Sequence, residues 1–246
     1  MCEEVSYGYK KIAASEKRRL ILGHFETIAG RYDLADALLS FGLHFYWRQR
    51  VLRRLKLKPG DTVLDLCAGT ADFAVMAAGM VGPVGKAVVC DISRAMMIAG
   101  QQKVVRAGVA DRVHWVQGDA ERMGFAGKSF DAVIVGYGIR NFVFLERGVR
   151  EIRRVLKNDG KFVAMEFGIP ETPWLRALYH FYSFKIMPAA GKLITGTADP
   201  FHYLAESIRV FPAPDRVRAL MTASGMVNVD SERLTGGLAV LYYGEK

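Results

Sequence analysis

The chain contains few cysteines and no long apolar run. Its three cysteines, Cys2, Cys67 and Cys90, lack the spacing of metal ligands and cannot build a disulfide framework, so the sequence predicts no metal site. No apolar stretch reaches the roughly 18–20 residues of a transmembrane helix. The N-terminal sequence MCEEVSYGYKK lacks the apolar core of a signal peptide. These absences predict a soluble cytoplasmic protein.

Acidic residues are in the minority. The chain carries 25 acidic and 34 basic side chains, a net charge of +9, and many of the basic ones fall within residues 10–19 and 48–58. Such a balance suits a nucleic acid or an anionic membrane surface. The hydrophobic fraction of 51% allows a full core in one large α/β domain or two small ones. The sequence has no internal repeat and no low-complexity linker.

One stretch, Asp61 to Asp72 (DTVLDLCAGTAD), organises the rest of the chain. Its first half is a run of β-branched and apolar residues ending at Leu66, which is typical of a buried strand. Small residues follow, among them Gly69 and Thr70, and we expect a helix to begin near Asp72. Small residues at such a turn let a ligand approach the backbone and leave the helix N-terminus open. The stretch therefore predicts a ligand-binding unit of strand, turn and helix.

A carboxylate further along the chain indicates that this ligand contains a ribose. Asp91 stands 22 residues after Gly69, at the end of a second apolar run, 87–90, and Ile92 follows it. A carboxylate in this place can accept hydrogen bonds from both ribose hydroxyls. Asp91 and Ile92 are therefore candidate cofactor-binding residues.

The turn itself bears on which nucleoside is bound. A dinucleotide-binding turn would read G-x-G-x-x-G, whereas Gly69 is the only glycine here and Asp65 lies within the strand. The turn resembles the D-x-G-x-G-x-G loop of class I methyltransferases, which bind S-adenosylmethionine. Cys67 and Ala71 replace the outer two glycines, so we expect their φ angles to be negative, because a side chain disfavours positive φ. A nicotinamide cofactor is the alternative that the turn alone leaves open.

Strands and helices alternate regularly after the turn. This order predicts a parallel sheet with the ligand crevice at the carboxyl ends of the strands. A helical, aromatic-rich insertion follows Pro170, and two closing strands joined through Gly236-Gly237 make an antiparallel finish. The expected strands are 62–66, 86–90, 113–116, 130–135, 161–167, 225–229 and 238–242, and the expected helices are 71–80, 93–107, 146–157, 173–194 and 214–224.

Together these elements predict an α/β fold of the class I methyltransferase type. It is a Rossmann-like, seven-stranded, mostly parallel sheet whose last strand is antiparallel. We expect residues 1–58 to form a helical N-terminal extension over the ligand edge of the sheet, with helices over 15–23 and 28–57. Residues 59–246 would form the methyltransferase domain, with a helical insertion at 170–212.

Two further groups of residues follow strands at the ligand edge. Asp119 and Ala120 come after the third strand, where a carboxylate can accept a hydrogen bond from the adenine amine; a helix cap is the alternative role of Asp119. Gly136 begins the sequence GYGIRN after the fourth strand, and its two glycines would let the chain pass close to the cofactor. Arg140 and Asn141 then place a cation and an amide near the point of methyl transfer, since a guanidinium favours an ionised, electron-rich phenol ring. An ion pair with a helix carboxylate is the alternative role of Arg140.

Three segments make the resemblance to one family specific. Residues 32–47 (YDLADALLSFGLHFYW), 136–141 (GYGIRN) and 203–212 (YLAESIRVFP) are similar to the signatures of the ubiquinone/menaquinone biosynthesis C-methyltransferase family, and LTGG at 234–237 resembles its C-terminal turn. The similarity runs from about residue 24 to residue 244. It implies an enzyme that uses a polyprenylated quinol as acceptor and binds S-adenosylmethionine through Thr70, Asp91, Asp119 and Ala120.

The resemblance leaves the acceptor open between related quinols. Methylation of demethylmenaquinol to menaquinol is the expected reaction, and the methoxy-polyprenyl-benzoquinol of ubiquinone synthesis or a related quinone is the alternative. A nucleic-acid methyltransferase is more remote, because no Asn-Pro-Pro-Tyr-like base-flipping motif follows the fourth strand. The intact cofactor motifs argue against a non-catalytic subunit.

The basic N-terminal residues and the apolar segments together predict a peripheral membrane protein. The aromatic residues of 173–194 and of the N-terminal helices would shelter the prenyl chain, while the basic surface rests on anionic lipid at the inner face of the membrane. We expect no nucleic-acid partner, and the sequence leaves a homodimer open.

Binding to anionic vesicles should fall steeply with added salt. The attraction between cations and a charged lipid surface is screened over about 10 Å at 0.1 M salt. Co-sedimentation with anionic and with neutral vesicles over a salt series measures the effect. Equal sedimentation with both lipids at every salt concentration would contradict the charge argument.

Overall fold

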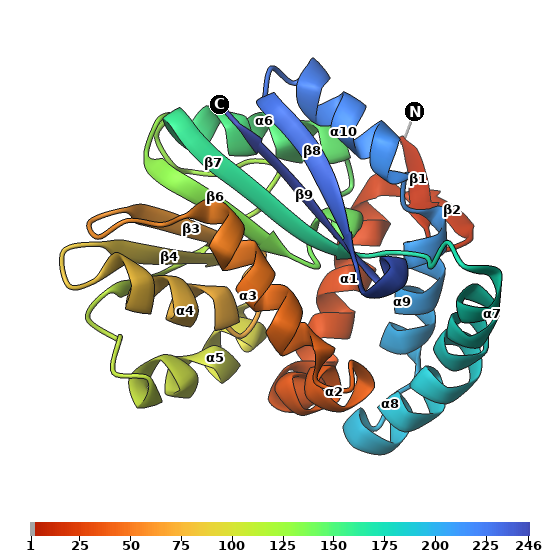
Figure 1. Cartoon of the computed structure of the whole chain (residues 1–246). Coiled ribbons are helices and arrows are strands. Elements are labelled where there is room, and N and C mark those ends of the chain that lie inside the picture. The colour runs from red at the N-terminus through yellow and green to blue at the C-terminus, as the bar shows by residue number, and fades with distance from the viewer. Residues whose placement is uncertain (1–2) are drawn as a thin grey trace.

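The structure, a computed structural model, describes residues 3–246 and contains a seven-stranded sheet with helices on both faces (Figure 1). The strand order is β5-β4-β3-β6-β7-β9-β8. Strand β9 runs antiparallel to both of its neighbours, and the other paired strands of the sheet are parallel. The predicted fold is therefore confirmed. The strands are β3 (Thr62–Leu66), β4 (Lys86–Asp91), β5 (Val113–Gln117), β6 (Phe130–Gly136), β7 (Leu156–Phe167), β8 (Val227–Leu234) and β9 (Ala239–Glu245).

The central strands are apolar on both sides because helices cover both faces of the sheet. Helices α3 (Leu43–Leu55), α4 (Asp72–Val81) and α5 (Arg94–Arg106) pack on one face. Helices α6 (Leu145–Val155) and α10 (Pro214–Ala223) pack on the other. Each helix buries one stripe of its surface, as an amphipathic sequence requires.

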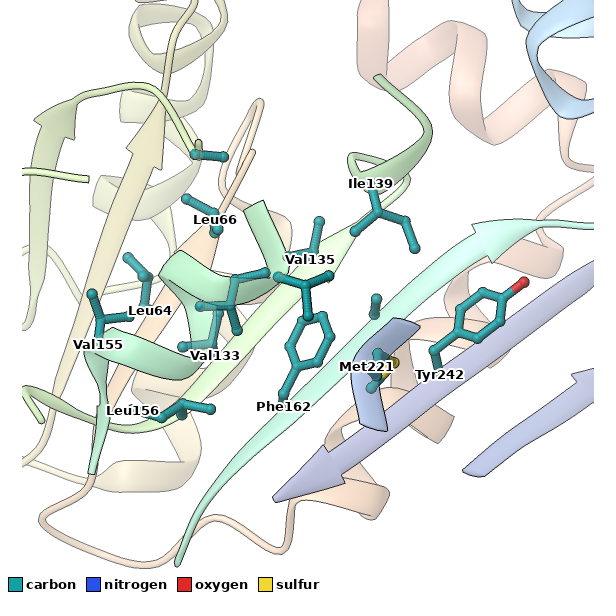
Figure 2. Packing of buried hydrophobic residues seen from close by; sticks show 14 of the residues in the cluster. Leu64, Leu66, Val133, Val135, Ile139, Val155, Leu156, Phe162, Met221 and Tyr242 are labelled. Atoms are coloured by element: carbon teal, nitrogen blue, oxygen red, sulfur yellow. The ribbon is translucent and has the colours of Figure 1, made fainter. Parts of the chain in front are cut away.

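The core between β6, β7, α6 and α10 holds the strand ends in place (Figure 2). Its side chains come from both central strands and both helices, so the loops that follow β3 and β6 start from a fixed frame. The labelled members are Leu64, Leu66, Val133, Val135, Ile139, Val155, Leu156, Phe162, Met221 and Tyr242.

The N-terminal part differs from the expected pair of helices. It begins with a hairpin that the sequence pattern did not reveal, because each of its strands has only four residues. The expected helix over 28–57 is broken where Phe41 and Gly42 adopt positive φ angles. The elements are β1 (Glu4–Tyr7), β2 (Lys10–Ala13), α1 (Ala14–Ile28), η1 (Ala29–Arg31), α2 (Tyr32–Leu39) and α3.

Two other boundaries differ from expectation. Helix α6 ends at Val155, and β7 begins at Leu156, which pairs with Phe130 before a register shift, so residues 158–160 lie within β7 instead of forming a stop. Strand β8 extends to Leu234, beyond the expected 225–229.

The insertion is helical as expected and comprises α7 (Pro173–Phe181), the π-helix η3 (Tyr182–Ile186), α8 (Met187–Thr195) and α9 (Asp199–Val210). Within residues 3–246, no helix has the length and apolar character that crossing a bilayer requires.

Gly100 and Gly79 provide a matched test of how tightly α5 is pressed against the turn after β3. A Cβ atom on Gly100 would stand 2.6 Å from the backbone oxygen of Thr70, whereas one on Gly79 in α4 meets no atom within 4 Å. Gly100→Ala should lower the free energy of unfolding by about 1–3 kcal/mol. Gly79→Ala should raise it by about 0.5–1 kcal/mol, because alanine favours the helix. Urea denaturation measures both, and equal effects would contradict the close packing of α5 on the turn.

Candidate active site

Two cavities meet at the carboxyl ends of β3, β4 and β6. The first cavity lies over these strand ends, and all ten candidate site residues line it. The second cavity, about 430 Å³ in volume, lies between the N-terminal helices and the insertion. The candidate residues are Asp65, Gly69, Thr70, Asp91, Ile92, Asp119, Ala120, Gly136, Arg140 and Asn141. The residues that line both cavities are Ile21, Phe25, Tyr32, Tyr137 and Arg140.

The turn after β3 contradicts one expectation from the sequence. Cys67 and Ala71 have φ angles of 55° and 66°, so both occupy the left-handed region that we expected them to avoid. Such a conformation costs a non-glycine residue roughly 1–2 kcal/mol. Surrounding contacts hold it, since the Ala71 amide donates to the Ala68 oxygen at 2.8 Å and Ala71 is fully buried. Burial also raises the pKa of the Cys67 thiol, which disfavours the reactive thiolate form.

Asp91 fixes the turn to the end of β4. Its carboxylate accepts hydrogen bonds from the backbone N–H groups of Gly69 at 2.8 Å and Ser93 at 2.7 Å. Burial raises the pKa of Asp91, and these two hydrogen bonds oppose the shift. Each carboxylate oxygen still has a lone pair free for a ligand hydroxyl.

Asp65 lines the first cavity and has one unsatisfied oxygen. One carboxylate oxygen accepts from the Ala74 backbone amide at 2.8 Å, and the other is buried and has no partner within residues 3–246. Burial raises the pKa of Asp65 to about 8. A cationic ligand would satisfy this carboxylate and favour its ionised form.

Thr70 takes part in an internal network, which the sequence did not indicate. Its hydroxyl donates to Asp33 on α2 at 2.6 Å and accepts from Lys103 on α5 at 3.0 Å. Lys103 also binds Asp72 in the first turn of α4. Arg48 of α3 continues the network, because its buried guanidinium contacts Asp36 at 2.7 Å and Asp72 at 2.8 Å. Thr70 therefore links the turn to the N-terminal helices.

Asp119 and Ala120, which follow β5, line the first cavity. Asp119 pairs with Arg18 of α1 at 3.0 Å and accepts a hydrogen bond from the Glu121 amide at 2.9 Å. It lies in a turn, so the alternative of a helix cap does not apply. Ala120 is buried beside it, and the Ile92 carbonyl accepts from the side-chain Nε2 of Gln117 at 3.0 Å.

The glycines after β6 are explained by packing within the protein. A Cβ atom on Gly136 would stand 2.5 Å from the Phe73 ring, and one on Gly138 would stand 2.6 Å from Cys67. Close approach to a cofactor, the reason we expected, is therefore not needed to account for them. The two glycines bring the loop after β6 down onto the turn after β3.

Arg140 is a buried member of an ion pair. Its Nη1 donates to Glu166 at the end of β7 at 2.6 Å and to the Tyr137 carbonyl. This partner of Arg140 lies on a strand, whereas the alternative role that we considered for Arg140 was an ion pair with a helix carboxylate. Although burial disfavours the charge, Glu166 keeps the pKa of Arg140 above its ordinary value. The buried Nε of Arg140 has no acceptor within residues 3–246, and Arg140 is one of the residues that line both cavities.

Asn141 is oriented by the insertion. Its side-chain oxygen accepts from the Tyr203 hydroxyl of α9 at 3.1 Å. Tyr203 in turn stacks on Tyr7 of the N-terminal hairpin, with ring centroids 4.5 Å apart. The amide nitrogen of Asn141 is thereby left to donate into the cavity.

The structure adds residues that sequence reasoning missed. Tyr137 adopts a φ of 57°, stacks on Phe167 and has a buried hydroxyl without a partner in the described chain. Nothing in the sequence of a tyrosine between two glycines indicated this backbone conformation, this stacking or this buried hydroxyl. Glu166 did have one, because a single acid interrupted an otherwise apolar strand, 161–167. Within residues 3–246 no group of three His, Cys, Asp or Glu side chains is placed to hold a metal; Cys2 lies outside the described residues.

The first cavity fits S-adenosylmethionine, the cofactor implied by the resemblance. The unpartnered oxygen of Asp65 is complementary to the cationic part of the cofactor, and the free lone pairs of Asp91 suit its ribose hydroxyls. Asp119 and Ala120 line the same cavity, which their expected contact with adenine requires. The donor and acceptor pattern of these residues therefore matches the cofactor.

Comparison with known proteins agrees with this chemistry. Residues 11–246 match the model of the ubiE/COQ5 methyltransferase family. The ubiquinone/menaquinone biosynthesis C-methyltransferase UbiE of Ectopseudomonas mendocina is 38% identical to the chain over 98% of its length and 94% of that protein. UbiE of Pasteurella multocida is 36% identical over 99% of the chain and 91% of that protein.

Solved structures share the fold at lower identity. A SAM-dependent methyltransferase from Aquifex aeolicus superimposes with a TM-score of 0.61 at 16% identity and covers 96% of this chain and 99% of that one. Phosphoethanolamine N-methyltransferase 2 of Haemonchus contortus, in complex with S-adenosyl-L-methionine, gives a TM-score of 0.60 at 15% identity, over 82% of this chain and 52% of that one. These similarities support the α/β methyltransferase fold.

Asp91→Ala should weaken the binding of S-adenosylmethionine by ~1–3 kcal/mol, roughly tenfold or more in affinity, because ribose hydroxyls lose their acceptor. Calorimetric titration measures the affinity. Asp61→Ala is a suitable control, since Asp61 is a surface carboxylate that accepts from the Lys58 amide, outside both cavities. Unchanged affinity in a folded Asp91→Ala protein would remove Asp91 from the binding site.

Proposed function

The chain belongs to the ubiE/COQ5 methyltransferase family, and on that premise we propose that its acceptor is the ring of a polyprenylated quinol, namely demethylmenaquinol. The protein is an enzyme of ubiquinone/menaquinone biosynthesis that transfers a methyl group from S-adenosylmethionine to carbon. The ten candidate residues act in this proposal as its donor site and its catalytic groups. Residues 1–58 serve as an extension of the methyltransferase domain, 59–246, and the insertion at 170–212 completes the acceptor side.

The apolar second cavity supports a quinol with a prenyl tail. Its walls are mainly aliphatic and aromatic side chains from α1, α2, η3 and α9. Burial of the tail against them is favourable at roughly 25 cal/mol per Å² of apolar surface. The same composition favours a fused naphthoquinol ring over a methoxy-benzoquinol, because each additional buried oxygen needs a hydrogen-bond partner.

The observation that carries the chemistry is the buried Nε–H of Arg140, which has no acceptor within residues 3–246 and belongs to a residue that lines both cavities. A quinol oxygen would accept this hydrogen bond and become easier to ionise. Asn141, held by Tyr203, would orient the ring through its amide nitrogen. Bound S-adenosylmethionine supplies an electrophilic methyl group. The electron-rich ring carbon next to the oxyanion is the nucleophile that Arg140 and Asn141 position.

A peripheral contact with the membrane is part of the same proposal, because the acceptor's tail is lipid-soluble. The basic N-terminal surface that we expected to carry this contact is reduced by internal pairing. Lys17 is buried and donates to the Phe142 carbonyl, while Arg18, Arg48 and Arg50 form salt bridges. The exposed cations Arg53 and Arg54 lie in the last turn of α3, and the exposed Lys56 and Lys58 follow this helix.

Replacement of Arg140 tests the catalytic role. Loss of an oxyanion donor typically costs on the order of 10²–10³ in turnover, so Arg140→Ala should slow methylation by about this factor. Arg140→Lys should cost less, because it keeps the charge but loses the planar fork. Single-turnover methylation of a short-tailed demethylmenaquinol with saturating cofactor measures the step, and cofactor affinity should change little.

A second variant separates chemistry from folding. Arg140→Ala leaves Glu166 as an unpaired buried carboxylate, whereas Arg140→Ala combined with Glu166→Gln removes that charge. The double variant should regain stability in urea but remain slow. A rate within a few-fold of wild type in either variant would take Arg140 out of the chemical step. A higher kcat/KM for a short-tailed methoxy-benzoquinol would overturn the choice of acceptor.

A further inference from the structure

Helix α7 carries an exposed apolar stripe beside the half-buried Leu175 and Tyr179, which line the second cavity. None of its nine residues is buried, although Trp174, Leu178 and Phe181 stand at four- and three-residue steps on one side. The side chain of Trp174 is 68% exposed. A surface helix of a globular protein normally turns such a stripe toward the core. The stripe of α7 therefore lacks the partner that its sequence is suited to.

The exposed sides of α2 and α8 extend this apolar surface. On α2, Leu34 and Leu38 are exposed one turn apart, Phe41 is exposed just after the helix, and Leu193 of α8 is 85% exposed. The elements adjoin, since α2 packs against α8 and the Tyr182 hydroxyl of η3 donates to the Leu39 carbonyl at 2.6 Å. In Figure 1, α2 and α8 lie together below the sheet and α7 follows along the rim.

We call this surface the apolar face. It is larger than the scattered exposed residues that are normal on a monomer. Its members are Leu34, Leu38, Phe41, Trp174, Leu178, Phe181, Ile186 and Leu193.

The charged side chains of residues 173–195, the segment that carries most of the apolar face, are all positive. Residues 173–195 contain no Asp or Glu, and they contribute Arg176, Lys185 and Lys192, all exposed. The two acids of α2 are engaged inward, Asp33 with Lys103 and Asp36 with Arg48. Such a surface is complementary to an anionic one. In a symmetric dimer through this face, the cations of one copy would instead face the same cations of the other copy and repel them.

The apolar face also surrounds the opening of the second cavity. Phe41, Leu178 and Ile186 line that cavity and are exposed at the same time, so they mark its mouth. We propose that the apolar face inserts into the headgroup region of an anionic lipid bilayer, so that the second cavity opens directly toward the lipid. The inference rests on the proposed function, because it supplies the route by which a lipid-soluble quinol reaches the cavity. It places the contact on α2, α7 and α8 instead of the basic N-terminal surface.

Trp174 provides a built-in probe. Of the three tryptophans, Trp47 is buried, Trp115 is half-buried and only Trp174 is exposed. On addition of vesicles of phosphatidylglycerol and phosphatidylcholine, the fluorescence of Trp174 should shift to the blue and be quenched by lipids brominated near the headgroup. Trp174→Phe should remove both signals.

Two matched substitutions locate the contact. Leu193→Glu adds a negative charge to the apolar face. Val84→Glu adds the same charge elsewhere, at an exposed apolar residue between α4 and β4. Val84 packs on Gly60, just beyond the end of α3. Leu193→Glu should weaken vesicle binding by at least about tenfold, because apolar insertion and attraction to anionic lipid are both lost. Val84→Glu should leave it unchanged. Both proteins should methylate a water-soluble, short-tailed quinol at the wild-type rate.

The outcomes separate the lipid contact from the reaction. Equal vesicle binding by the two variants, or a larger loss in Val84→Glu, would overturn the proposal. So would a wild-type dimer in sedimentation equilibrium that Leu193→Glu converts to a monomer without loss of vesicle binding, since the face would then join two copies. If the wild-type protein bound vesicles through Trp174 but left the short-tailed quinol unmethylated, the proposed acceptor would fail while the lipid contact stood.

Discussion

The buried guanidinium of Arg48 joins the two halves of the site. It contacts Asp36 on α2 and Asp72 at the start of α4, so the helices of the acceptor side are fixed to the turn that lines the donor side. Burial raises the pKa of Asp36 to about 6 even with this partner. Removal of Arg48 would leave the Asp36 carboxylate without a counter-ion and Asp72 with Lys103 alone, and an unpaired carboxylate as buried as Asp36 is strongly destabilising. The position of α2 over the sheet, and with it the wall between the cavities, depends on this pairing.

The two parts of the proposed reaction would take place in cavities with different linings. The first cavity presents carboxylates and backbone groups, which suit a charged nucleoside, and the second presents aliphatic and aromatic carbon, which suits a prenylated ring. Arg140 belongs to both, and its pairing with Glu166 makes it a fixed donor instead of a free cation. In the proposed reaction, its orientation therefore matters as much as its charge.

The candidate site was largely accessible to sequence reasoning, whereas the reasons for individual residues often were not. Asp65, Gly69 and Asp91 could be found because the carboxyl ends of parallel strands meet at one edge. The positive φ of Cys67 and Ala71 could not, because it depends on packing that holds a strained turn. Thr70 is satisfied by Asp33 and Lys103, a contact between segments far apart in the chain. Net charge was the least informative feature, since a count of cations does not reveal which of them are buried or paired.

The sequence by itself determined the α/β methyltransferase fold, the chain order of the seven sheet strands and the helices that cover them, and the family. These follow from local patterns: the period of apolar residues, the small residues of one turn and three short signatures. Only the tertiary structure decided how the extension and the insertion meet over the sheet, that Glu166 and Tyr203 hold Arg140 and Asn141, and that the apolar stripe of α7 faces outward. An amphipathic pattern states that a helix has an apolar side but not what covers it, because that depends on residues distant in sequence.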